Sequence, residues 1–240
     1  QNILCLTFTE TAARNMRERL ETLIGPDAYR VAIYTFHGFC TDIIGRYPEY
    51  FFNQAAYKSA SELIRSEILE RIFEKLPHKH ILGGYHKERG YAYLKEAQGR
   101  IKDIKKGGLT PERFKEILDE NTKAFVMLNE ILAEHLPERI SKDSIPSFEI
   151  MKDKFEKTAT SLGSSYAIEI KNVITDCEEE GKNTPLSTWK SKETTKDEDG
   201  NRVFKDYLSL GRLYALTDIY KEYQERLHAA GYFDFEDMIL

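Results

Sequence analysis

Apolar positions change their spacing close to the start of the chain. Residues 3–6 form a continuous apolar run with the length of a buried strand, whereas Ala13, Met16 and Leu20 recur at the spacing of a helix face. The change falls at Thr9, and threonine is a residue type that caps helix N-termini. The pattern therefore predicts a strand that passes through a short loop into a helix.

The same pattern is repeated once, a short distance further along the chain. Residues 31–35 have the composition of a strand, residues 36–38 form a corner, and Phe39, Ile43 and Tyr47 lie on one face of a following helix. Two strand-loop-helix units in tandem predict parallel strands, and ligands of such sheets bind beyond the carboxyl ends of the strands. The residues expected at that edge are Thr7, Phe8, Thr9, Thr35, Phe36 and His37.

The rest of the chain is patterned mainly for helices. The expected helices cover residues 61–76, 91–106, 110–136, 148–175 with an interruption at 161–165, and 207–230. The charged stretch between them, around residues 190–205, predicts either a short hairpin turning near Gly200 or a mobile loop, and its composition favours the mobile loop. Asp234 is a suitable N-cap for a last helix.

Two of these stretches carry recognisable motifs. The pattern Thr-Phe-Thr-x-x-Ala-Ala-x-x-Met-x-x-Arg-Leu at residues 7–20 and the pattern Thr-Phe-His-Gly-Phe-Cys at residues 35–40 resemble motifs Ia and Ic of UvrD/Rep-type superfamily 1A DNA helicases. Residues 220–240 resemble the segment that leads back into the first motor domain of this family, and residues 100–112 resemble, more loosely, a pattern in its helical 1B insertion.

The resemblance implies a mainly α fold. A partial RecA-like α/β unit of the P-loop NTPase type, with parallel strands, would carry a large helical insertion. In these terms residues 1–52 would be part of domain 1A, residues 53–218 the 1B insertion, and residues 219–240 the return segment to domain 1A.

The resemblance also implies a function. Such a helicase uses ATP and Mg²⁺ to move along single-stranded DNA, with a suggested 3′ to 5′ direction, and it unwinds duplex DNA. The sequence contains no G-x-x-x-x-G-K-[ST] phosphate loop and no Asp-Glu pair after an apolar strand. We therefore expect a piece of a longer protein that does not bind or hydrolyse ATP alone, and whose partners are DNA and the remaining motor domains: the rest of 1A, 2A and 2B.

Binding single-stranded DNA without sequence preference requires phosphate-binding groups and flat apolar surfaces for bases. Hydroxyls of Thr7, Thr9 and Thr35, rings of Phe8 and Phe36, and the His37 imidazole can supply both. Each of these residues taken alone is more often a core residue or a helix cap, but together, in the matched motifs, they favour contact with the strand. Glu10 replaces the asparagine that is common in the family at this position.

A second candidate surface lies at the end of the predicted helix 91–106. Cationic side chains meet a Gly107-Gly108 corner and a new helix start at Thr110-Pro111, and helix N-termini offer backbone donors to phosphates. A solvated lysine face is the alternative interpretation. The resemblance favours contact with duplex DNA or its backbone by Arg100, Lys102, Lys105, Lys106 and Thr110.

Composition narrows the class of protein. The 240 residues are 41% hydrophobic and 31% charged, as in a globular protein, and no apolar run has the length of a membrane helix. Three cysteines without C-x-x-C spacing indicate reduced residues of an intracellular, cytoplasmic protein.

The pair His78 and His80 lacks further ligands nearby, so we expect no metal site. The net charge of −5 decides little, because a motor needs positive potential only along its channel.

Two alternatives remain open at this point. The chain can instead be a non-catalytic helical module that binds a partner protein through the charged segment 190–199. Within the helicase family, the long insertion also suits a helicase-nuclease subunit of the AddA/RecB type.

Overall fold

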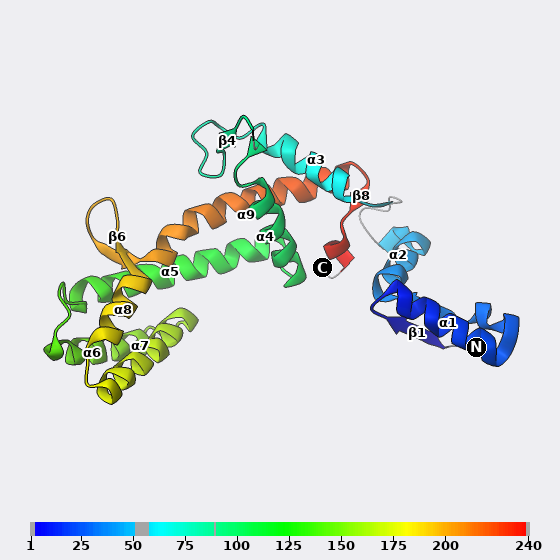
Figure 1. Ribbon diagram of the computed structural model, residues 1–240. Coiled ribbons are helices and arrows are strands. Elements are labelled where there is room, and N and C mark those ends of the chain that lie inside the picture. Colours follow the sequence, from blue (N-terminus) through cyan, green and yellow to red (C-terminus); the bar gives the residue numbers. More distant parts are fainter. Residues whose placement is uncertain (1–2, 51–57, 89, 239–240) are drawn as a thin grey trace. The chain divides into compact units, whose positions relative to one another are not determined.

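The computed structural model describes residues 3–50, 58–88 and 90–238, and most of them are helical (Figure 1). They pack into two compact units, each taken here by itself. Unit one consists of Gln1–Thr110 and Asp218–Leu240, and unit two is Pro111–Thr217. None of the described helices is both long and apolar enough to cross a membrane. The boundaries predicted from the motifs, 52/53 and 218/219, divide domain 1A from the 1B insertion, and they stay a prediction.

Unit one begins with the expected pair of strand-loop-helix units. The elements are β1 (Leu4–Thr7), α1 (Glu10–Ile24), a 3₁₀ helix (Gly25–Arg30), β2 (Ala32–Thr35) and α2 (Phe36–Arg46). The strands β1 and β2 are parallel, with Leu4 opposite Ala32 and Thr7 opposite Thr35. The helix α2 ends before Tyr47-Pro48, because proline disfavours helical geometry in the preceding residue. The parallel pair is compatible with a partial P-loop-like unit.

The remaining part of unit one joins segments from distant parts of the chain. It contains β3 (Lys58–Ser59), α3 (Glu62–Phe73), β4 (Tyr85–His86), β5 (Gly90–Tyr91), α4 (Leu94–Lys106), the last turns of α9 (Lys205–Ala229), β8 (Tyr232–Phe233) and a 3₁₀ turn (Phe235–Met238). The strand β3 pairs in parallel with β8. The end of the chain thus returns to the segment that follows α2.

The start of α4 differs from the sequence prediction. Tyr91 was expected inside the helix, but it lies in β5 and pairs with Tyr85 of β4, with ring centroids 5.0 Å apart. Aromatic residues favour strands, and a cross-strand ring contact adds to that preference. The end of α4 agrees with the prediction, because the helix stops at Lys106 and Gly108 adopts a left-handed φ of 69°.

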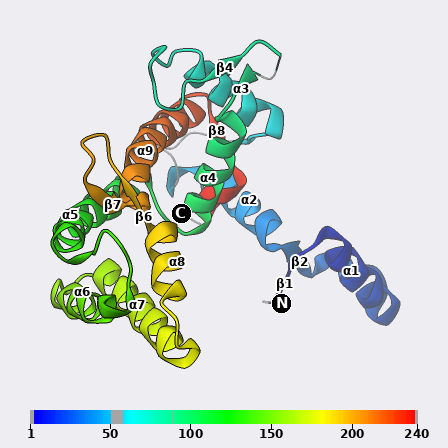
Figure 2. The same ribbon diagram turned by 60° about the vertical axis from the view of Figure 1, so that its left-hand side comes forward.

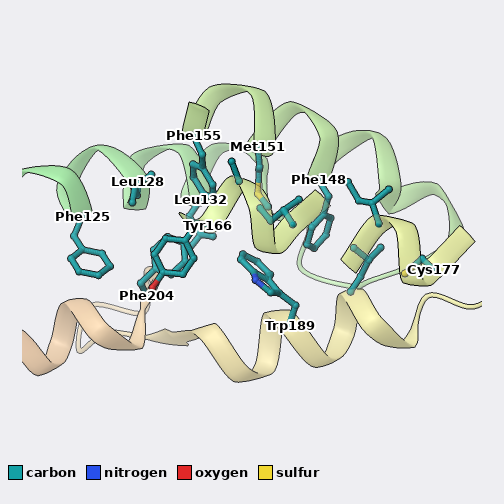
Figure 3. Close-up of a cluster of buried hydrophobic side chains, with 14 of the residues drawn as sticks. Phe125, Leu128, Leu132, Phe148, Met151, Phe155, Tyr166, Cys177, Trp189 and Phe204 are labelled. Atoms are coloured by element: carbon teal, nitrogen blue, oxygen red, sulfur yellow. The ribbon is translucent and has the colours of Figure 1, made fainter. Parts of the chain in front are cut away.

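Unit two is built around one apolar core. Its elements are α5 (Pro111–His135), a 3₁₀ helix (Lys142–Ser144), α6 (Ile145–Lys157), α7 (Ser161–Glu180), α8 (Thr184–Glu193), β6 (Thr194–Lys196), β7 (Arg202–Phe204) and the first turns of α9. Figure 3 shows aromatic rings from these helices and from β7 meeting in the core. The centroids of the Tyr166 and Phe204 rings lie 4.2 Å apart, and both side chains are buried.

Two expectations for unit two are corrected. The interruption expected at residues 161–165 falls at 158–160, because Thr160 caps α7 by accepting a hydrogen bond from the Gly163 amide. The mobile loop favoured around residues 190–205 is wrong, since β6 and β7 form an antiparallel hairpin (Figure 2). Burial of Val203 and Phe204 fixes one arm, and the Asp197 carboxylate accepts from the amides of Asp199 and Asn201 in the turn.

Candidate nucleic-acid interface

The carboxyl ends of β1 and β2 place the six predicted residues at one edge, which we call the strand-end surface: Thr7, Phe8, Thr9, Thr35, Phe36 and His37. Two of these are large apolar side chains that face solvent. Phe8 is 87% exposed, Phe36 is 42% exposed, and their ring centroids lie 5.1 Å apart at an interplanar angle of 42°. Exposed aromatic rings beside each other offer the flat apolar surface on which unpaired bases stack.

Two threonines of the strand-end surface, Thr9 and Thr35, are helix caps. The Thr9 hydroxyl accepts a hydrogen bond of 3.1 Å from the Ala12 amide at the start of α1. The Thr35 hydroxyl accepts from the Gly38 amide at 3.0 Å at the start of α2, and this side chain is only 6% exposed. Caps of this kind set the direction in which the chain enters each helix.

Glu10 links the two strand ends. Its carboxylate accepts a hydrogen bond of 3.1 Å from the Thr35 hydroxyl, 25 residues further along the chain. This buried hydroxyl therefore uses its only donor and one of its two acceptor lone pairs inside the protein. These two bonds give the Thr35 hydroxyl a positioning role, and its contact with the strand stays a prediction. Thr7, opposite Thr35 in the strand pair, is partly exposed.

His37 stacks on a ring from the far end of the chain. The imidazole and the Phe235 ring are nearly parallel, at an interplanar angle of 15°, and their centroids are 3.3 Å apart. Phe235 begins the 3₁₀ turn after β8 and remains 43% exposed. Phe235 was not among the site residues predicted from the sequence. Its position directly after Asp234 in the return segment was the available signal, but the stacking partner depends on tertiary structure.

The basic end of α4 divides into accessible cations and one buried cation. Arg100 lies 4.0 Å from Glu96, and Lys102 lies 3.6 Å from Glu236; their side chains are 64% and 50% exposed. The Arg100–Glu96 pair is exposed on both sides, and such pairs are weak and leave the cation available to another anion. The Lys102 ammonium pairs with a buried carboxylate, although its own side chain is half exposed. Lys106 and Thr110 are also exposed.

Lys105 does not belong to that accessible surface. Its side chain is fully buried, and its ammonium lies 2.6 Å from Asp234 and 2.8 Å from Asp237. A buried ammonium between two carboxylates cannot reach an external phosphate, so the predicted backbone contact of Lys105 is wrong. Lys105 and Lys106 are adjacent lysines in the sequence, and only the packing of α4 separates the buried side chain from the exposed one.

The surroundings of Lys105 change the pKa of one neighbouring carboxyl and of one tyrosine hydroxyl. Burial raises the pKa of the Asp234 carboxyl, and the Lys105 ammonium opposes that shift. Burial also raises the pKa of the Tyr223 hydroxyl, which donates a hydrogen bond of 3.1 Å to Asp234. Asp234 is thus paired with Lys105 and Tyr223. Among the described residues, no group of three or more His, Cys, Asp or Glu could hold a metal ion.

The residues present do not fit a nucleotide and its Mg²⁺. The sequence has no phosphate loop, and the buried carboxylates Asp234 and Asp237 are occupied by Lys105. The N-termini of α1 and α2 are capped by Thr9 and Thr35.

Comparison with known proteins points to one family. The family model "UvrD/REP helicase N-terminal domain" matches residues 1–240. The "ATP-dependent DNA helicase PcrA" of Bacillus subtilis is 51% identical over 45 residues, which are 19% of this chain and 6% of the relative. PcrA of Staphylococcus aureus strain Mu50 is 44% identical over 45 residues, with the same shares of both chains. The matched stretch thus spans a small fraction of these curated relatives.

Proposed function

Because the chain belongs to the UvrD/REP helicase N-terminal domain family, we propose that it is part of an ATP-dependent DNA helicase that moves along single-stranded DNA and unwinds duplex. In this proposal the strand-end surface contributes to the path of the single strand. Residues 1–52 and 219–240 are parts of motor domain 1A, and residues 53–218 are its helical 1B insertion. The protein acts in the cytoplasm.

One observation supports this role above the others: Phe8 and Phe36 expose neighbouring rings at the carboxyl edge of parallel strands. Single exposed apolar side chains are common on protein surfaces, but two neighbouring aromatic rings form a patch of the kind that binding sites use. Each base stacked on an aromatic ring contributes about 1 to 3 kcal/mol, and stacking tolerates every base. This is the property that a motor needs when it moves over changing sequence.

The other residues of the surface supply orientation and charge. The caps Thr9 and Thr35 direct the helix starts toward the strand ends, and His37 can donate a hydrogen bond to a phosphate from its position against Phe235. We further propose that Arg100, Lys102, Lys106 and Thr110 contact duplex DNA or its backbone. ATP, whose hydrolysis supplies the energy for movement, and Mg²⁺ are assigned to the remaining motor domains, because this sequence lacks the phosphate loop.

The first test measures binding of a fluorescently labelled single-stranded oligonucleotide to this chain by anisotropy, over a series of salt concentrations. The double variant Phe8→Ala/Phe36→Ala should raise Kd by about 5-fold to 150-fold, which corresponds to the loss of one stacked base. Leu23→Ala is the matched control, because Leu23 is 79% exposed on α1 and lies outside the strand-end surface.

Other outcomes have distinct meanings. Salt-sensitive binding that the Phe8/Phe36 variant leaves unchanged would move the contact to the basic end of α4. The absence of binding by the wild-type chain would contradict the proposed strand path and favour the alternative of a helical module that binds a partner protein.

A further inference from the structure

Lys105 of α4 connects both ends of the turn that carries Phe235. Its ammonium lies 2.6 Å from Asp234 and 2.8 Å from Asp237, which are 129 and 132 residues away in the sequence. Asp234 directly precedes Phe235, and Asp237 follows it by two residues. A single buried cation therefore binds the chain on either side of the ring that stacks on His37.

The turn is also closed on itself. The Asp234 amide donates to the Asp237 carboxylate at 2.8 Å, and the Asp237 amide donates to the Asp234 carboxylate at 3.0 Å. We call residues 234–237 the return turn. Because its two carboxylates are fixed by these amides, a cation bound to both of them determines the orientation of the whole turn.

Helix α9 completes the surroundings of Lys105. Tyr223 donates to Asp234 at 3.1 Å, and Gln224 donates to Asp237 at 2.6 Å. His228 lies 4.0 Å from the Asp237 carboxylate. The ammonium also lies 5.7 Å from the ring centroid of Tyr220 and 5.2 Å from that of Tyr223, within the range of a cation–π interaction.

A contribution to stability does not by itself explain this arrangement. Replacing a buried ion pair by apolar residues of similar volume is often neutral or stabilising, because the charges lose their hydration. Here one ammonium faces two carboxylates, so a formal charge of −1 is buried among Lys105, Asp234 and Asp237. What such a cluster does supply is a defined geometry, since the Lys105 ammonium donates to both carboxylates and so fixes the distance of each from α4.

We propose that Lys105 is a positioning residue that keeps the Phe235 ring on the His37 imidazole and thereby couples α4 to the strand-end surface. The part of this inference that concerns DNA rests on the proposed function. The stacking itself is a property of the protein and can be measured without DNA. Displacement of α4 would then change the position of His37 through the return turn.

The test is the proton NMR spectrum of the His37 ring in this chain. Protons above the face of an aromatic ring are shifted upfield, so the stacked His37 signals should lie upfield of an exposed histidine, and Phe235→Leu should abolish that shift. Lys105→Met should abolish it as well. Lys95→Met is the matched control, because Lys95 is exposed on the same helix, and it should leave the His37 signals in place.

A charge-matched variant protects the test against loss of folding. Lys105→Met alone makes the buried formal charge more negative, from −1 to −2. The double variant Lys105→Met/Asp237→Asn returns it to −1 without the lysine. We expect this double variant to keep its circular dichroism spectrum and to lose the upfield shift. Retention of the shift in either folded lysine variant would overturn the proposal.

The DNA arm separates this inference from the proposed function. If both hold, the double variant should also bind a single-stranded oligonucleotide about 3-fold to 10-fold more weakly, a fraction of the effect of losing one stacked base. Loss of the His37 shift with unchanged DNA affinity would support the positioning role of Lys105 and contradict the participation of His37 in the strand path.

Discussion

The Thr35 side chain connects one strand to the starts of two helices. It ends β2, caps α2 through the Gly38 amide, and donates to Glu10 at the start of α1. The buried hydroxyl thus fixes the relative direction of two helix starts that neighbour the exposed rings of Phe8 and Phe36. Rigid support of this kind keeps exposed binding side chains in place.

His228 gives the fold a pH dependence of known sign. Burial lowers the pKa of its imidazole below the ordinary value of 6.5, with Lys105 acting in the same direction and Asp237 and Asp234 opposing it. As the pH falls, the unfolded chain therefore binds this proton first, and the free energy of unfolding decreases. We expect the free energy of unfolding to decrease less in His228→Gln than in wild type between about pH 7.5 and about pH 5.5. Urea unfolding at each pH measures this difference.

The control for this prediction is His86→Gln, because His86 is an exposed residue of β4. The Asp234 carboxyl, whose pKa burial raises, acts in the opposite sense, since its contribution is lost as the pH rises through its folded pKa. It is present in wild type and in both variants, so the difference between them isolates His228. Equal pH slopes for His228→Gln and wild type would contradict the prediction.

At the scale of elements, α7 depends on a glycine in its first turn. A Cβ atom at Gly163 would overlap the Thr158 hydroxyl, and it would lie 2.5 Å from the Phe155 carbonyl oxygen and 2.9 Å from the Thr160 hydroxyl. The end of α6 and the cap of α7 therefore approach this position too closely for any side chain. The close approach explains why the break between the helices falls at residues 158–160.

Gly163→Ala is expected to destabilise the chain by about 1 to 3 kcal/mol, the usual cost of overpacking, although alanine is the better helix former. Gly99→Ala in α4 is the matched substitution, because a Cβ there meets no atom of the described residues within 4 Å. Gly99→Ala should raise the free energy of unfolding by about 0.5 to 1 kcal/mol. Urea unfolding of both variants measures the contrast, and a gain in stability for Gly163→Ala would show that α6 and α7 move apart easily.

At the scale of the whole molecule, the two units differ in how the chain builds them. Unit two is one continuous segment, Pro111–Thr217, with its own aromatic and aliphatic core. Unit one needs both ends of the chain, since β3 pairs with β8 and Lys105 of α4 pairs with Asp234 and Asp237. The continuous unit has everything that independent folding requires.

We therefore expect residues 111–217, produced alone, to give a helical circular dichroism spectrum and one cooperative thermal transition. Residues 1–110 alone should lack a cooperative transition, because β3 would lose its partner β8, and α4 would lose the residues of 218–240 that cover Lys105. Cooperative unfolding of residues 1–110 and non-cooperative unfolding of residues 111–217 would contradict this division of the fold.

The sequence by itself determined the features that local spacing encodes. The change of period at Thr9 and again after Thr35 located both strand-loop-helix units, and the glycine corner at 107–108 located the end of α4. It also carried the motifs that place the chain in its family. The strand-end surface followed from these, because parallel strands bring their carboxyl ends to one edge.

Only the tertiary structure decided which of two similar residues is buried and which distant residues meet. It separated Lys105 from Lys106, placed Phe235 on His37, and ordered a charged stretch into the β6–β7 hairpin by burying Val203 and Phe204. The physical reason is that these outcomes depend on contacts between residues far apart in the chain. Their free energy comes from burial and pairing in the folded state, which local spacing and composition do not record.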